Sequence, residues 1–416
     1  MTSRSTGSLA RTSLLAAVLG STVGLLSAVY LLVVRWGTDL VWDGHHARLP
    51  GPVWLGTAVV CVVGGLLVGL VRRRHDADTP HDLDDTLLAL DGVIGDDRAS
   101  PVPKPTWLLR AAVLGVISLV AGASLGPEAP LLALATGLGQ RMARILRTTR
   151  AEAASLSAAG ALSGMLGGPL GAVALPVERS ATPAAAVRLV GPWVVAGVAG
   201  FLVFLIVLPP GDGLRFDLPP VSYTSALDVL RVLGWALPAA LLGAVVGFVI
   251  VVGTIPGRRL AERLLPSTVL RAVVGGAVLA ACGVLSPLCL FSGEHEVEEL
   301  ATVTSGLLLL LGLKIVATLA CLTSGWFGGQ IFPAIFAGMA AGLLVLQLFP
   351  SAPVTVVMAA GAGAAATAVL RRPLAATLIL AVFLPAPALV PVLVGVGIAA
   401  VVANVLGDRL PSPGPH

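Results

Sequence analysis

One carboxylate stands out as a residue that could do chemistry, because its neighbours are almost all apolar. Glu128 lies in the sequence Gly126-Pro127-Glu128-Ala129-Pro130, where one apolar run ends and another begins. An acid among apolar segments is costly, so it usually has a function. If a helix begins here, its free N–H groups attract a permeating anion and the Glu128 carboxylate alike. An ionised Glu128 then competes with the anion and a protonated one withdraws, which predicts a pH-sensitive gate. The alternative is a helix-capping acid without a role in transport.

The composition identifies the environment that surrounds this acid. Of the 416 residues, 56% are hydrophobic and 12% are charged, against roughly 25% charged residues in soluble domains. Lys314 is the one charged residue in the stretch 301–370, and the stretch 374–407 has none. A soluble core cannot bury so much apolar chain, whereas a bilayer can. We therefore expect an all-α polytopic membrane protein, and the composition excludes a soluble enzyme.

Long apolar segments provide the candidate membrane helices. At a rise of about 1.5 Å per residue, about 20 residues cross the hydrocarbon. Several segments, the last above all, are too long for one span and contain Gly or Pro, so we expect pairs of shorter, tilted helices. The aspartate-rich stretch 72–105 is predicted to be mostly a solvated connection. The apolar segments are 12–34, 52–71, 106–125, 155–177, 189–209, 229–255, 269–291, 300–322, 331–349, 353–370 and 374–406.

The remaining charges and the cysteines limit the partners. Arginines gather at segment ends, which is typical of loops that face the cytoplasm. The net charge of +4 is modest and scattered, so nucleic acid is not an expected partner. All four cysteines lie inside apolar segments without metal-type spacing, and we interpret them as packing residues. No metal or other cofactor is predicted.

An internal repeat connects the Glu128 segment with a second one. Gly329-Gln330-Ile331-Phe332-Pro333 also lies between apolar runs, and 203 residues separate its first glycine from Gly126. Downstream, an A-A-G-A segment precedes G-P-L in the first half and R-P-L in the second, and the prolines of these motifs are 204 residues apart. Repeats broken by Gly or Pro at matching positions indicate a binding site near the middle of the membrane.

Together, the two broken segments predict an anion pathway. A helix that starts inside the membrane has free N–H groups that lipid cannot satisfy, and these groups attract anions. The alternative is ordinary Gly or Pro kinks in packed helices. We place membrane repeat 1 at 12–209, a linker at 210–224 and membrane repeat 2 at 225–408, with short polar termini at 1–11 and 409–416.

These motifs resemble those of the chloride channel (ClC) family. The segment 126–130 is similar to its G-[RK]-E-[GA]-P motif, 328–333 to its G-x-F-x-P segment, and 372–374 to its closing repeat motif. The similarity covers nearly the whole chain and is greatest with a short bacterial branch of ion-transport proteins without a regulatory domain. The resemblance implies two inverted-topology repeats of broken, tilted helices in a multi-pass protein of a bacterial cell membrane.

The resemblance also implies roles for individual residues. Glu128 corresponds to the family's gating glutamate. The implied anion-binding residues are Gly126, Glu128, Ala129, Gly329, Gln330 and Ile331. Among them, Gln330 and Ile331 match positions whose backbone N–H groups face a central anion, and Gly126, Glu128 and Ala129 match an outer anion site. The implied assembly is a homodimer in which each subunit has its own pore for chloride or a related small anion, with or without protons.

The chain departs from the family pattern at one motif residue and at two anion ligands. Pro127 replaces the motif's arginine, which removes a positive charge and one backbone N–H. The family's serine ligand aligns with Ala77 in the acidic segment 76–80, or alternatively with the segment 91–95. The family's tyrosine ligand near the C-terminal end is absent. The central site then consists of backbone groups alone, or accepts an anion other than chloride.

Two further charged residues have two interpretations each. Counting from Pro169, the family's inner glutamate falls on Arg179, which favours a passive channel. A shift of one residue gives Glu178 a place in a proton path, and otherwise Glu178 is an acid at a helix end or interface. Lys314 is either a fixed positive charge that raises anion occupancy of the pore, or a lysine satisfied by helix-end carbonyls. The polar cluster 294–299 fits no standard metal site and is expected to form a loop at the pore mouth.

The sequence thus favours transport of chloride-like anions through a pore gated by Glu128, with a passive channel preferred to anion/proton exchange. A degenerate member of the family that no longer conducts is one alternative. An intramembrane enzyme is another, but no histidine lies inside an apolar segment and no H-E-x-x-H or G-x-S-x-G motif is present. We therefore expect no enzyme activity.

Overall fold

Helices account for nearly all of the regular structure. The computed structural model describes residues 6–43, 52–73, 82–95, 102–170, 174, 178, 183–208 and 215–407. Short 3-10 or π-helical turns extend or join several helices, and one isolated β-bridge pairs two loops within the described residues. The helices are α1 (Thr6–Thr38), α3 (Val53–Arg72), α4 (Leu83–Gly95), α5 (Pro105–Val120), α6 (Glu128–Met142), α7 (Arg150–Met165), α9 (Pro183–Val207), α10 (Ala226–Leu264), α11 (Thr268–Leu285), α12 (Val297–Thr302), α13 (Leu307–Ser324), α14 (Ile331–Leu343), α15 (Val354–Leu370), α16 (Pro373–Phe383) and α17 (Leu389–Leu406).

The expectation of a polytopic helical membrane protein is confirmed. Within the described residues, 7 helices are long and apolar enough to cross a membrane, and shorter apolar helices lie between them. The last apolar segment divides as expected, because α16 ends at Phe383 and α17 begins at Leu389. In contrast, α10 continues through Pro238 and Pro256 as a single helix of 39 residues, longer than the apolar segment that predicted it.

The aspartate-rich stretch contains a helix where the sequence predicted a solvated connection. Helix α4 packs against α6 and α7. Its Leu83, Leu90 and Val93 are buried, and this spacing places them on one face of a helix. The hydrophobic stripe was hidden in the sequence by the aspartates that alternate with it. The segment 76–80, one of the two alignments for the missing serine, lies outside the described residues.

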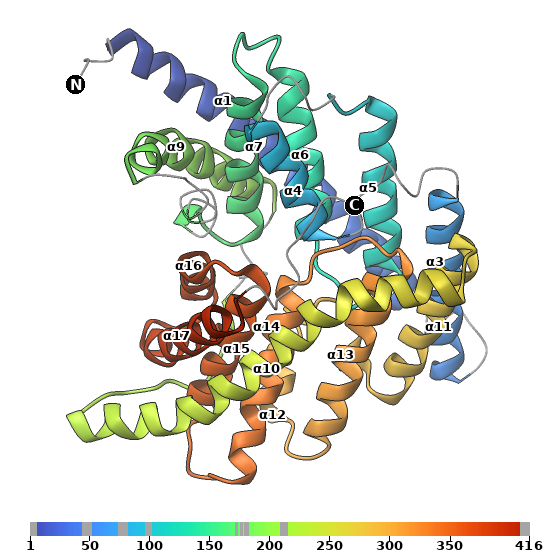
Figure 1. The fold of residues 1–416 in the computed structure, drawn as a ribbon, viewed down its shortest axis with the longest axis vertical. Coiled ribbons are helices and arrows are strands. Elements are labelled where there is room, and N and C mark those ends of the chain that lie inside the picture. Colours follow the sequence, from blue (N-terminus) through green and yellow to red (C-terminus); the bar gives the residue numbers. More distant parts are fainter. Residues whose placement is uncertain are drawn as a thin grey trace.

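The two halves of the chain repeat the same helix packing. In Figure 1, α1, α5, α6, α7 and α9 lie together in the upper part, while the helices of the second half fill the lower part. Helix α7 packs between α1 and α9, and α15 packs in the same way between α10 and α17. Glycines permit both close approaches: a Cβ on Gly160 would lie 2.7 Å from the Cα of Gly20, and one on Gly243 would lie 2.7 Å from the Cα of Gly361. Gly160 and Gly361 occupy matching places in the two A-A-G-A segments.

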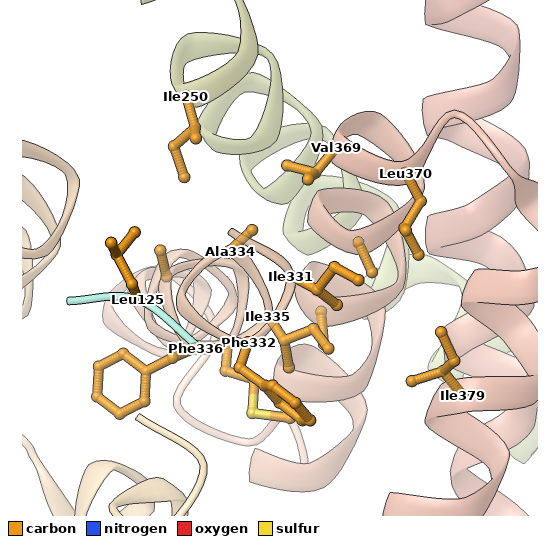
Figure 2. Close-up of a cluster of buried hydrophobic side chains, with 14 of the residues drawn as sticks. Leu125, Ile250, Ile331, Phe332, Ala334, Ile335, Phe336, Val369, Leu370 and Ile379 are labelled. Carbon is orange, nitrogen blue, oxygen red and sulfur yellow. The ribbon is translucent and has the colours of Figure 1, made fainter. Parts of the chain in front are cut away.

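The halves are also interlocked. Helix α3, from the first half, packs against α11 of the second half, as Figure 1 shows at its right edge. Helix α14 lies in the middle of the molecule and is buried along its whole length. Figure 2 shows apolar side chains around it from α10, α15 and α16. The labelled residues from these three helices are Ile250, Val369, Leu370 and Ile379. The start of α14 is therefore held rigidly at the centre of the protein.

Candidate functional site

The two broken segments found as a sequence repeat meet in the structure. Gly126 N–H donates to the Gly329 carbonyl at 2.8 Å, and Gly329 N–H donates to the Gly126 carbonyl at 2.7 Å. This antiparallel bridge joins matching positions of the two halves. It also occupies the N–H groups of both glycines, so neither can donate to an anion while the bridge holds. Their contribution to the site is its backbone framework.

A helix begins shortly after each glycine of the bridge. Helix α6 begins at Glu128, and α14 begins at Ile331 with Gln330 as its N-cap. The N–H groups in the first turn of a helix have no carbonyl partner within that helix. Pro130 and Pro333 lie in these first turns, where a proline costs no hydrogen bond. Two partially positive helix ends thus meet at the centre of the protein.

Glu128 places its carboxylate between these helix ends. Its side chain is fully buried, and Oε1 accepts a hydrogen bond from Phe332 N–H at 3.1 Å. The N–H groups of Ile331 and of Glu128 itself also lie close enough to favour the charged carboxylate. Among the described residues, Oε2 has no partner. A Cβ on Gly126 or on Gly329 would lie 2.6 Å from the Glu128 Cδ, so only glycines leave room for the carboxylate.

Buried polar contacts fix the loop that precedes α14. Phe327 N–H donates to the Ser118 hydroxyl at 3.0 Å, and the Trp326 indole N–H donates to the Ala272 carbonyl at 3.2 Å. The buried Arg72 donates to the carbonyl of Gly325, where the chain adopts a φ of 94° that favours glycine. These contacts come from α5, α11 and α3, so helices of both halves hold the loop in place.

Lys314 is buried near α14 and is bonded to carbonyl groups. Its ammonium donates to the carbonyls of Leu290 and Phe291 at 3.2 and 2.9 Å and lies 4.8 Å from the centre of the Phe336 ring. These carbonyls follow a short 3-10 turn, so the arrangement resembles the predicted lysine satisfied by helix-end carbonyls. The Phe336 ring belongs to α14, so the Lys314 ammonium lies beside this helix. A role of this charge in attracting anions stays a prediction.

Glu178 contacts the start of a helix in the second half. Its carboxylate accepts hydrogen bonds from the N–H groups of Leu374 and Ala375 at 2.7 and 2.8 Å, and Arg372 donates to its carbonyl at 3.0 Å. These contacts cap the N-terminus of α16. They suit the interpretation of Glu178 as an acid at an interface, while a place in a proton path stays a prediction.

Asp84 is a site residue that the sequence interpretation missed. Its Oδ2 accepts a hydrogen bond from the side-chain amide of Gln330, at 3.1 Å. Burial and the negative charge of Asp82 raise the pKa of Asp84 to about 7, against the opposing effect of Arg371. Helix α4 is not among the candidate membrane spans. The leucine spacing within the aspartate-rich stretch was the signal that could have placed this acid on a packed helix.

The polar cluster at 294–299 contributes to a pocket near Phe332. This pocket is lined by Arg215, Phe216, Glu294, His295, Val297, Glu298 and Phe383. The ring of Phe383 packs edge-on against Phe332 at 5.5 Å, and the Phe332 N–H donates to the Glu128 carboxylate. Burial, and next the charge of Glu296, raise the pKa of Glu294 to about 7. The arrangement suits the predicted loop at a pore mouth.

The two tyrosines of the chain have different surroundings. Tyr223 donates its hydroxyl to the Pro387 carbonyl at 2.6 Å. Tyr30 is buried against Gly115 and Pro130, and its hydroxyl has no partner among the described residues. The four cysteines are buried free thiols, as packing residues are. In the described part of the chain, no three His, Cys, Asp or Glu side chains gather closely enough to hold a metal.

The fold and the site define an integral membrane protein of two inverted repeats whose broken helices meet around one buried glutamate. The family model "Voltage gated chloride channel" matches residues 64–404, and the chain belongs to this family of anion-transport proteins. It is 30% identical over 368 residues to "Putative ion-transport protein YfeO" of Escherichia coli (strain K12 / DH10B) and of Shigella flexneri, covering 83% of this chain and 82% of each relative.

Solved structures confirm the fold. A slow cyanobacterial Cl−/H+ antiporter superposes with a TM-score of 0.78 at 23% identity, over 96% of both chains. A CLC-type fluoride/proton antiporter superposes with a TM-score of 0.74 at 18% identity, over 98% of both chains. A eukaryotic CLC transporter gives 0.77 at 20% identity, over 96% of this chain and 72% of its own.

Proposed function

We propose that this chain carries chloride-like anions across the membrane between the N-termini of α6 and α14, and that Glu128 is the gate. The observation that supports this proposal is the position of the Glu128 carboxylate. It accepts N–H groups from the start of α14 in a fully buried place, above a bridge made of two glycines. A bound anion requires the same N–H donors, so the carboxylate and the anion exclude one another.

Protonation opens the gate in this mechanism. An ionised Glu128 is held by the helix N–H groups, while a neutral one is attracted to them less strongly. The neutral side chain then turns away, and the anion takes the N–H groups of the first turn of α14. Gln330 and Ile331 donate from the α14 side, and Ala129 donates from the α6 side. Transport therefore increases as the pH falls.

We propose a passive channel rather than an exchanger. The acid nearest to the family's inner glutamate, Glu178, is bonded to the N-terminus of α16, which supports a capping role for it rather than a place in a proton path. Exchange with protons is the second candidate. It is favoured by the similarity of the fold to a Cl−/H+ antiporter and to a fluoride/proton antiporter. Proton flux measured beside anion flux separates the two.

The proposal includes the assembly and the role of Lys314. We expect a homodimer in a lipid bilayer with one pathway in each subunit. Lys314 adds a buried positive charge near α14, which favours anions in the pathway. Replacing it by Gln keeps a donor for the carbonyls of Leu290 and Phe291 but removes the charge, and the anion affinity should fall.

The test is anion efflux from liposomes that contain the purified protein and are loaded with chloride, nitrate or fluoride. Glu128→Gln should conduct at pH 7.5 at least as fast as the natural protein does at pH 5, because its side chain is always neutral. Glu262→Gln, at an exposed position near the end of α10, is the matched control and should behave like the natural protein. Absence of efflux for every anion and pH would support the non-conducting alternative.

A further inference from the structure

Three aspartates at the start of α4 have three different roles. Asp82 accepts the Asp85 N–H at 3.0 Å, which caps the helix, and its other oxygen pairs with Arg258 at 2.7 Å. Asp85 also pairs with Arg258, at 3.5 Å. Asp84 takes part in neither contact and instead bonds to Gln330. Capping and the arginine pair therefore explain two of the acids and leave Asp84 unexplained.

Gln330 connects Asp84 to the anion site. It is the N-cap of α14, so its backbone stands where the anion is proposed to bind. The residue is only 4% exposed, and its side-chain Nε2 donates to Asp84. The amide oxygen at the other end, Oε1, is buried and has no partner among the described residues. A buried polar atom without a partner is costly, so a ligand or a different amide orientation belongs in this place.

We propose that Asp84 is a second proton-controlled element of the anion pathway, which sets the anion affinity at the start of α14 through the amide of Gln330. The inference rests on the proposed anion transport. When Asp84 is ionised, it fixes the amide with the NH2 group toward itself, and its negative charge repels an anion at the neighbouring helix end. The amide oxygen then faces the space that a ligand would fill.

When Asp84 is protonated, both effects are reversed. Its O–H donates to the Gln330 Oε1 after the amide has turned by half a rotation, and this orientation has the same shape because amide oxygen and nitrogen are nearly equal in size. The NH2 group then occupies the place of the unpartnered oxygen and offers two donors to an anion. The proton thus removes a repulsion and adds hydrogen-bond donors.

The surrounding charges are suited to such a proton switch. Asp82 and Asp85 on the same helix start favour the protonated form of Asp84, and Arg371 at the end of α15 favours the ionised form. Arg258 is directed to the other two aspartates. On the neighbouring helices α6 and α7, Arg141 bonds to the Pro103 carbonyl and Glu152 bonds to Thr148. Arginines near membrane-helix ends are typical of the cytoplasmic side, so we expect the proton to come from the cytoplasm.

Chloride binding to the purified protein, measured by isothermal titration calorimetry, tests the inference. Glu128→Gln is the parent, so that the gate is neutral at every pH. With a pKa of about 7, Asp84 is almost fully neutral at pH 5.5 and about 3% neutral at pH 8.5. If only the neutral form binds, the affinity should therefore fall about 30-fold between these pH values.

The variants isolate Asp84. Asp84→Asn mimics the protonated acid, because its side-chain NH2 can donate to the Gln330 oxygen, and it should bind chloride equally at both pH values with the acid-form affinity. Asp84→Glu should restore a pH dependence. Asp85→Asn removes the same charge one residue away without touching Gln330, and it should keep most of the pH dependence of the parent.

Each outcome decides between the proposals. A parent that binds chloride equally at both pH values, or an Asp84→Asn variant that keeps the pH dependence, would overturn the inference and leave Glu128-gated transport intact. If Asp85→Asn, and not Asp84→Asn, loses the pH dependence, the switch belongs to Asp85, and the inference about Asp84 is overturned as well. If the parent neither binds chloride nor shows efflux at any pH, the proposed function itself fails, and the role of Asp84 fails with it.

Discussion

Substitution of Gly329 by alanine should open the gate without changing Glu128. A Cβ at this position would lie 2.6 Å from the Glu128 Cδ and 3.0 Å from its Cβ. Gly329 does not have a positive φ, so alanine fits the backbone and the clash with the carboxylate is the main consequence. The carboxylate must then leave the N–H groups of α14, as a protonated Glu128 does.

The size of the effect follows from the contact that is lost. A hydrogen bond to a charged acceptor, such as the one from Phe332 N–H, contributes about 1.5–3 kcal/mol. This energy corresponds to a factor of about 10 to 150 between the closed and open states, since about 1.4 kcal/mol is a factor of ten. Chloride efflux at pH 7.5 should rise by this factor when the closed state predominates, and its dependence on pH should weaken.

Two further variants make the result interpretable. Gly312→Ala, in α13, is the matched control because nothing lies within 4 Å of its added Cβ, and its efflux should equal that of the natural protein. Gly329→Ala combined with Glu128→Ala shows whether the added methyl group blocks the path: efflux should match that of Glu128→Ala. Natural efflux and natural pH dependence in a folded Gly329→Ala protein would refute the reasoning.

Three other substitutions test the surroundings of the site. Ser118→Ala leaves the buried N–H of Phe327 without a partner and should lower the free energy of unfolding by about 1–3 kcal/mol, seen as a lower midpoint of thermal unfolding in detergent. Glu178→Gln should lower that midpoint slightly by weakening the cap of α16, with anion efflux unchanged; a loss of coupled proton flux would instead make Glu178 part of a proton path. Glu294→Gln should be more stable than the natural protein at pH 8 but not at pH 5. Because the pKa of Glu294 is raised to about 7, the folded state keeps the Glu294 proton to a higher pH than the unfolded state does. The natural protein therefore loses stability as the pH rises from about 4.5 through 7. Equal midpoint differences at the two pH values would contradict this pKa shift.

The sequence predicted the helix starts and the paired glycines of the candidate site well, because these motifs define a backbone conformation. Gly126 and Gly329 were found as equivalent positions of a repeat, and they are the residues that bridge the two halves. The motifs also predicted helix starts at Glu128 and beside Gln330, where α6 and α14 begin. Gly and Pro restrict the backbone locally, so their meaning can be read without knowledge of the fold.

Contacts between distant segments could not be predicted in the same way. The bond from Gln330 to Asp84 joins residues 246 apart in the sequence, and no local pattern encodes such a pairing. Helix α4 was also missed, because its aspartates suggested a solvated stretch while only three buried apolar residues reveal its packed face. That the N–H group of each bridge glycine donates to the carbonyl of the other is likewise a property of the assembled halves alone.

The bridge between Gly126 and Gly329 has a consequence for the speed of the gate. It ties the two helix starts together through the backbone, and both helices are buried on all sides in their first turns. In the proposed mechanism, opening at Glu128 then involves the rotation of its side chain, and we expect no domain or helix to move against another. Rotations of side chains take picoseconds to nanoseconds when they are free, whereas hinge motions of domains take microseconds to milliseconds. If Glu128 is the gate as proposed, the waiting time of the closed pore is therefore set by the arrival of a proton, and only side chains move inside a rigid backbone frame.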